Sequence, residues 1–213
     1  MRRSDETPLQ SKRMEDIHHL PRLPRPYYQA FAVVHWTITL EPRAQGWLDA
    51  SFHAHFRELL LHASAREGLF CPTYVLMPDH LHLLWMGLRL ASDQINAMRF
   101  LRKYLQLELT RRGSSAAPPF ELQKQAHDRV LREEERKRGA FASACLYVLN
   151  NPVRADLVKQ PRDWPSLGAV VPGYPDVYPL DEGFWPLFWK LYAQHREPGN
   201  PPLLPPFWVS SPL

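Results

Sequence analysis

The segment Leu76–Trp85, which reads LMPDHLHLLW, contains two histidines separated by one residue inside an apolar run. Side chains alternate across a β-strand, so His80 and His82 are expected to share one face of it. The opposite face would carry apolar side chains that predict burial, namely Leu81, Leu83 and Trp85. Two adjacent imidazoles form half of a divalent metal site, although a pair of hydrogen-bonded strand histidines without any ligand fits the spacing equally well.

A second pair, His53 and His55, has the same spacing but a different context. Apolar residues in Asp49–Arg66 recur at helical intervals and predict an amphipathic helix. Successive helix residues are rotated by about 100°, so two residues at positions i and i+2 point to different sides. These two histidines are therefore expected to be solvated residues that do not share a metal ion.

The apolar segment before Pro152 is the other informative region. Three glutamates begin a predicted helix over Glu133–Asn150, and Pro152 limits its far end. Tyr147 and Asn151 are four residues apart, which places a phenol and a carboxamide on one helical face. A core aromatic and a chain-turning asparagine would also account for them, and a shift of one residue would make Asn150 the ligand instead.

The motifs PDHLH at 78–82 and YVLNNPVRA at 147–155 together resemble the REP-associated tyrosine transposases of the single-tyrosine HUH transposase superfamily. The resemblance spans about residues 32–164. It includes VVHWTIT at 33–39, DRVLR at 128–132 and DWPS at 163–166. One departure is visible, because this chain has Leu122 before Gln123 where many relatives have tryptophan.

The resemblance implies an α+β fold, a ferredoxin-like or RRM-like antiparallel sheet with helices packed on it. It implies that His80, His82 and Asn151 bind Mg²⁺ or Mn²⁺ and that Tyr147 is the nucleophile. The implied reaction is cleavage and transfer of single-stranded DNA at hairpin-flanked sites through a 5′-phosphotyrosine intermediate. A tyrosine with a pKa of about 10 attacks slowly unless the phosphate is polarised, which a bound cation would do.

The charge of the chain is compatible with a DNA partner. Lysines and arginines number 26 against 22 acidic residues, with a net charge of +4 and a pI near 9.2. Basic residues gather between the two halves of the site, and the candidates for DNA contacts are Arg102, Lys103, Lys124, His127, Arg129 and Arg132. Tyr104, in the same basic region, is a second candidate for the nucleophile.

The expected order of elements supports the fold prediction. Strands are predicted at 32–40, 70–77, 80–86 and 128–132, and helices at 49–66, 92–111 and 133–150. The predicted domains are a basic N-terminal arm at 1–26, a catalytic domain at 27–165, an aromatic-rich extension at 166–196 and a proline-rich tail at 197–213. The extension is expected to pin a C-terminal helix onto the domain, although its aromatics could also stack on unpaired bases.

Cys71 and Cys145 lack metal-binding spacing and are expected to be reduced thiols. No apolar run approaches the roughly 20 residues that span a membrane, so a cytoplasmic protein without a membrane partner is expected. Both a monomer and a homodimer are compatible with the sequence. Two alternatives to the enzyme are a catalytically silent DNA-binding regulator with the same fold and an RRM-like RNA binder.

Overall fold

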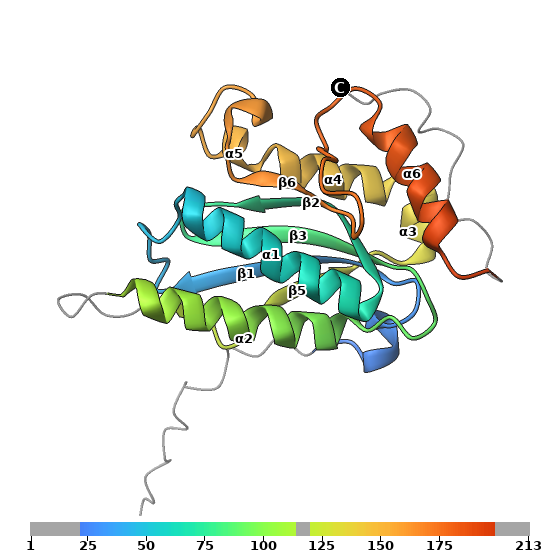
Figure 1. Cartoon of the computed structure of the whole chain (residues 1–213), viewed down its shortest axis with the longest axis horizontal. Helices are drawn as coiled ribbons and strands as arrows, with labels where there is room; N and C mark the ends of the chain where they lie inside the picture. The colour runs from blue at the N-terminus through green and yellow to red at the C-terminus, as the bar shows by residue number, and fades with distance from the viewer. Residues whose placement is uncertain (1–21, 114–119, 199–213) are drawn as a thin grey trace, which may run out of the picture.

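A computed structural model describes residues 22–113 and 120–198. Figure 1 shows a twisted sheet with helices on both of its faces. The strands are β1 Val33–Glu41, β2 Leu69–Leu76, β3 His80–Gly87, β4 Glu121–Leu122, β5 His127–Val130 and β6 Leu167–Val170. The helices are α1 Ala50–Glu67, α2 Gln94–Arg112, α3 Glu133–Lys137, α4 Ala140–Leu149, α5 Asn151–Arg154 and α6 Phe184–His195, with short 3₁₀ turns at Arg25–Tyr28 and Pro161–Asp163.

The sheet is antiparallel throughout, with the strand order β4-β1-β3-β2-β6 and with β5 also paired to β1. The four strands β5, β1, β3 and β2 lie side by side in that order, α1 connects β1 to β2, and α2 lies between β3 and β5. This arrangement is the ferredoxin-like pattern of two β-α-β units. It confirms the predicted α+β fold, to which β4 and β6 add short strands at the edges.

One face of the sheet packs against α1 and α2, which lie side by side across it in Figure 1. Trp36 and Trp85 are fully buried there, and the indole of Trp36 donates a hydrogen bond to Gln94 of α2 at 3.0 Å. Both helices begin at an aspartate that accepts backbone hydrogen bonds, Asp49 for α1 and Asp93 for α2. The apolar residues of β3 predicted to face a core therefore do so.

The other face is covered over only part of its area, by α4 and α6. Phe141 and Cys145 of α4 and Phe188 of α6 pack against Leu84 and Met86 of β3. The aromatic cluster of α6 is thus used for packing within the domain, which confirms the predicted role of the C-terminal helix. The rest of this face, around the start of β3, carries polar side chains.

The prediction of one continuous helix over 133–150 is wrong, because the structure has two helices there. The chain forms α3 and then α4, with a break at Gly139, whose φ of 87° lies in the left-handed region that glycine adopts readily. The predicted strand at 128–132 is displaced, since β5 covers His127–Val130 and Arg132 is already the N-cap residue that precedes α3. Of the predicted terminal segments, residues 1–21 and 199–213 lie outside the described residues.

His53 is not the solvated residue that the helical pattern predicted. Its Nε2 lies 2.8 Å from the hydroxyl of buried Tyr74, and burial lowers the pKa of His53 to about 4. Cys71 and Cys145 are both buried and free. Among the described helices, none combines the length and apolar character needed to cross a membrane.

Candidate active site on the open face of the sheet

The two histidines of β3 lie on the partly covered face of the sheet. In the pairing of β1 with β3, Thr37 is opposite His82 and Thr39 is opposite His80, so all four side chains point to the same side. The rings of His80 and His82 are 4.8 Å apart between centroids. The prediction that both imidazoles share one face is therefore confirmed.

Each of these rings has one nitrogen engaged by the protein. Nδ1 of His82 lies 2.9 Å from Oγ1 of Thr37 and 3.1 Å from Nε2 of His35. Nδ1 of His80 donates to the carboxylate of Asp79 at 2.6 Å, and Arg43 donates to the other oxygen of that carboxylate. Contacts of this kind orient an imidazole and leave its Nε2 for a ligand.

Burial keeps the central rings neutral at physiological pH. It lowers the pKa of His82 to about 3, assisted by neighbouring positive charge, and that of His35 to about 4, assisted by Arg129. Burial alone would raise the pKa of Asp79, but hydrogen bonds from His80 and Arg43 outweigh it and lower that pKa. A neutral imidazole is the form of His82 that binding to a metal ion requires.

Tyr147 reaches this face from α4. The buried residues of α4 that face the sheet include Ala144, Cys145, Val148 and Leu149, whereas Tyr147 is 39% exposed. Its ring centroid lies 5.5 Å from that of His82 and 5.8 Å from that of His35, with the rings edge to face. A phenol and two strand imidazoles are therefore neighbours within one chain.

Arg154 completes the surroundings of the phenol. Its guanidinium carbon lies 4.6 Å from the centroid of the Tyr147 ring, and its charge acts on His82 as well. The side chain comes from α5, which begins directly after α4. A guanidinium beside a phenol and two imidazoles is suited to binding a phosphate group.

Asn151 is the first residue of α5 rather than a member of the same helix as Tyr147. Its side chain is largely buried and makes no hydrogen bond to the described residues. The neighbouring amide of Asn150 instead donates to the carbonyl of Leu146 at 2.9 Å. This bond holds the Asn150 side chain against the end of α4, whereas the Asn151 side chain has no such bond. Asn151 therefore remains the candidate ligand, and that role stays a prediction.

The donor set can be tested against the predicted Mg²⁺ or Mn²⁺. Within residues 22–113 and 120–198, no group of three or more histidine, cysteine or acidic residues is placed to hold a metal ion. The Nε2 atoms of His80 and His82 are available as donors, and Asn151 would add a carboxamide oxygen. Mixed nitrogen and oxygen sets of this kind suit Mn²⁺ and are acceptable to Mg²⁺. The residues present therefore fit a cation whose remaining ligands are water or phosphate oxygens.

His35 and Arg154 belong to this site but were not among the predicted site residues. The signal for His35 was present, because it alternates with Thr37 and Thr39 along a predicted strand. Arg154 follows the tyrosine by seven residues, about two helical turns, which keeps it near the same side of the chain.

The predicted DNA-binding residues divide between two regions. His127 and Arg129 of β5 are opposite Thr37 and His35 of β1, so they lie on the face that carries the histidines. Arg129 forms an ion pair of 3.0 Å with Glu135, and exposed Arg132 is the N-cap residue directly before α3. Arg102, Lys103 and Lys124 line a cavity beside α2 instead.

Tyr104 also lies on α2, the helix that covers the opposite face of the sheet. Its ring packs against that of Phe100 at a tilt of 47°, and the ammonium of Lys103 lies 5.4 Å from the Tyr104 ring centroid. The sheet therefore separates Tyr104 from the two histidines of β3. Its candidacy as the nucleophile at this site is wrong on geometric grounds.

No family model matches this chain, and no curated protein matches it in sequence. A solved structure of a REP-associated tyrosine transposase bound to a REP hairpin has the same fold. The two share 19% sequence identity and a TM-score of 0.54, over 70% of this chain and 82% of the other.

Proposed function

We propose that this protein is a metal-dependent DNA nuclease and strand transferase that uses Tyr147 as its nucleophile. The proposed substrate is single-stranded DNA flanked by hairpins. The observation that carries the proposal is the position of the Tyr147 ring, 5.5 Å from that of His82 with Arg154 packed on it. The solved transposase of the same fold, which was bound to a DNA hairpin, supports this choice of substrate.

The proposed reaction exchanges one phosphoester for another. The phenolic oxygen of Tyr147 attacks the phosphorus of a DNA phosphodiester, and the bond from phosphorus to the 3′ oxygen breaks. The phenolic proton passes to solvent, and the 3′ oxygen leaves as a hydroxyl group. The product is a 5′-phosphotyrosine, which keeps the bond energy needed for a 3′-hydroxyl to reverse the step.

The chain's own residues bind and orient the reacting groups in this proposal. His80, His82 and Asn151 would hold Mg²⁺ or Mn²⁺, which when bound polarises the scissile phosphate. Asp79 fixes the ring of His80, and Thr37 with His35 fixes that of His82. Arg154 lies where its guanidinium can contact a phosphate oxygen beside the phenol.

The tyrosine and the histidines come from one chain, so the proposed site does not require a second copy. We therefore propose that a monomer is sufficient for cleavage.

The test is to incubate the protein with Mn²⁺ and hairpin DNA that carries a fluorescent label on the 3′ side of the cut. A covalent intermediate retains the label through denaturing electrophoresis. Tyr147→Phe should abolish this adduct, and Tyr104→Phe, a matched change of an exposed tyrosine, should leave it intact. Tight DNA binding without any adduct would indicate the silent regulator, and a preference for RNA would indicate the RRM-like binder.

A further inference from the structure

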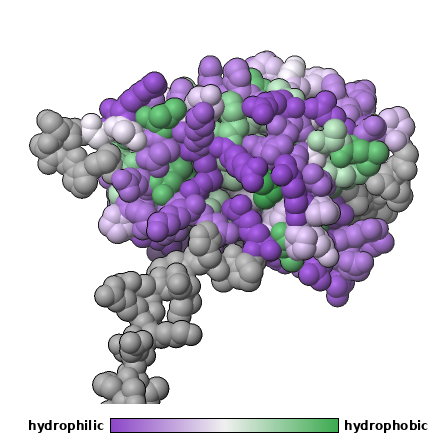
Figure 2. Space-filling view, turned by 90° about the horizontal axis from the view of Figure 1, so that it is seen from below, coloured by the Kyte–Doolittle hydropathy of each residue, from purple (hydrophilic) through white to green (hydrophobic). Residues whose placement is uncertain are grey.

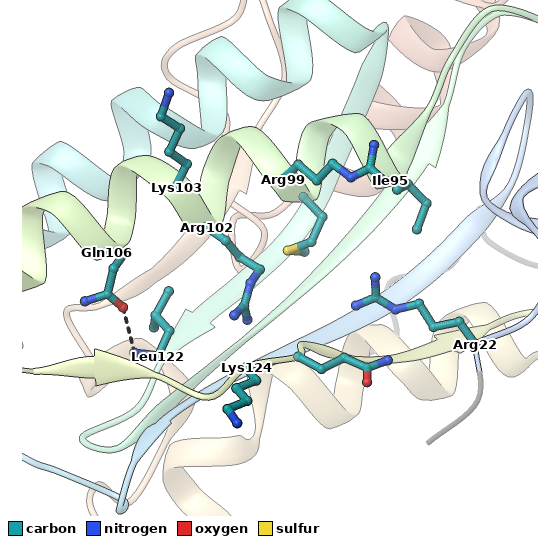
Figure 3. Close-up of a pocket in the computed structure, with 10 residues that line it drawn as sticks. Arg22, Ile95, Arg99, Arg102, Lys103, Gln106, Leu122 and Lys124 are labelled. Carbon is teal, nitrogen blue, oxygen red and sulfur yellow. Dashed lines mark hydrogen bonds between the residues drawn. The ribbon is translucent and has the colours of Figure 1, made fainter. Parts of the chain in front are cut away.

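A cavity of about 720 Å³ lies between α2 and the segment that joins β4 to β5. Figure 3 shows that Arg102 extends from α2 into the gap between the two segments and that Arg22 enters it from the other end. Ile95, Met98 and Leu122 form its apolar part. Gln106 holds the two walls together, since its side-chain oxygen accepts a hydrogen bond from the backbone of Leu122 at 2.8 Å.

The lining of this cavity is strongly positive. It contains no acidic residue and five cationic ones, which are Arg22, Arg99, Arg102, Lys103 and Lys124. Arg22 is paired with Asp128 at 3.2 Å, whereas within the described part of the chain the other four have no ion pair with an acidic residue. The surrounding surface, seen from below in Figure 2, is largely hydrophilic with small apolar patches. We call this cavity the α2 groove.

Arg102 carries a buried donor that no described residue satisfies. One of its terminal nitrogens, Nη2, donates to the carbonyl of Gln123, but Nη1 is buried and has no hydrogen-bond acceptor among residues 22–113 and 120–198. A buried guanidinium donor left without an acceptor is costly, because it has lost water and gained nothing in return. Burial and the nearby charge of Arg22 lower the pKa of Arg102, so an anion in the groove would relieve both effects.

The charges are spread along the groove rather than focused on one point. They come from the segment before β1, from successive turns of α2 and from the β4–β5 segment. A small anion would need donors that converge, whereas a chain of phosphates needs cations at intervals. The apolar part of the lining suits the sugar groups between the phosphates.

The groove and the candidate active site lie on the two sides of one sheet edge. α2 covers the opposite face of the sheet from the histidines, and the edge strand β5 separates the two regions. His127 and Arg129 project from β5 onto the histidine face. Arg129, which pairs with Glu135, thus places a guanidinium on the other side of this edge from the groove, and a single DNA molecule that passes around β5 would contact both sides.

We propose that the α2 groove binds the phosphodiester backbone of the substrate DNA outside the cleaved site, so that the DNA wraps around the β5 edge. This inference rests on the proposed function for the identity of the polymer. It assigns to Arg99, Arg102 and Lys124 a role in affinity that is separate from the chemistry at Tyr147.

The test is a binding measurement in the Tyr147→Phe background without metal, so that cleavage does not contribute. The double variant Arg99→Gln, Lys124→Gln removes two charges that make no hydrogen bond to described residues. The control Arg57→Gln, Lys190→Gln removes two exposed charges located away from the groove, on α1 and α6. Fluorescence anisotropy with a DNA hairpin and with an unstructured oligonucleotide of equal length is recorded at several salt concentrations.

The groove variant should bind DNA more weakly than the control variant. A plot of the logarithm of its binding constant against the logarithm of the salt concentration should also have a shallower slope than that of the control. Loss of two phosphate contacts reduces the slope by roughly 1.8 if the groove holds a duplex stem and by roughly 1.4 if it holds a single strand. A change confined to the hairpin or to the unstructured oligonucleotide identifies which form occupies the groove. Equal affinity and slope for the groove variant and the control would overturn the proposal, even if the wild-type protein forms the covalent adduct.

Arg102→Lys tests the buried donor itself. This change retains the charge but loses the planar arrangement of donors. The salt slope should stay the same, while affinity at fixed salt should fall by about five- to tenfold. Unchanged affinity would contradict the contact between Arg102 and DNA on which the inference depends.

Discussion

The ring of Tyr147 stands edge-on to that of His82, with an interplanar angle of 78° and 5.5 Å between centroids. The two side chains come from α4 and β3, which are brought together because α4 packs its buried residues on the sheet next to the histidines. This contact joins the two motifs that were informative in the sequence. It also gives specific expectations for the residues around it.

His35 should act by positioning His82. The variant His35→Ala removes a neighbour 3.1 Å from Nδ1 of His82, so the ring is less well oriented. Loss of such a supporting contact commonly weakens metal affinity by about 10- to 100-fold. Electron paramagnetic resonance of free Mn²⁺ measures that affinity without any DNA, and an unchanged value would contradict the role.

Arg154→Gln should slow adduct formation by about 10- to 1000-fold, because it removes a positive donor beside the phenol. Single-turnover kinetics at saturating DNA measures this rate. Arg162→Gln is a matched control, since Arg162 lies in the same way over the ring of Tyr178, 5.7 Å from it. If Arg154→Gln forms the adduct at the same rate as the control, Arg154 does not take part in the reaction.

The pKa of His53 predicts a pH dependence of stability. Its value of about 4 in the folded protein is below the ordinary value of 6.5, so the unfolded chain binds the proton more readily. The free energy of unfolding should therefore be largest above pH 6.5 and fall as the pH is lowered from 6.5 towards 4. Urea denaturation between pH 4.5 and 7.5 measures this, and His53→Gln should reduce the slope.

Gly139→Ala should destabilise the protein by about 1 kcal/mol, because a residue with a side chain is strained at a φ of 87°. A methyl group at this position would meet no other atom within 4 Å, so no clash adds to this cost. Thermal unfolding measures the loss. A neutral or stabilising effect would show that the break between α3 and α4 does not require a left-handed residue.

Much of the fold was predictable because its signals are local. The alternation around His80 and His82, the helical spacing in α1 and the order of strands and helices all survive in the structure. The interruption at Gly139 was missed because charged and apolar residues on either side both suit a helix. A single glycine does not reveal from the sequence which backbone conformation it adopts.

The sequence predicted the central residues of the candidate site but not all of the residues that surround them. His80, His82 and Tyr147 lie together, whereas His35 joins them only through the pairing of β1 with β3. The basic residues were predicted as one group, but they do not form one site. Their clustering in the sequence does not indicate which face of the sheet each side chain reaches. Arg129 and Arg102 are both in the predicted set, yet the sheet separates them.

The most direct test of the central claim is to locate the covalent bond by mass spectrometry. The wild-type protein is incubated with hairpin DNA and Mn²⁺, digested with a nuclease and a protease, and the modified peptide is sequenced. We expect a nucleotide linked through its 5′ phosphate to Tyr147. A nucleotide on another residue such as Tyr104, or DNA that is cleaved without any protein-linked nucleotide, would contradict it.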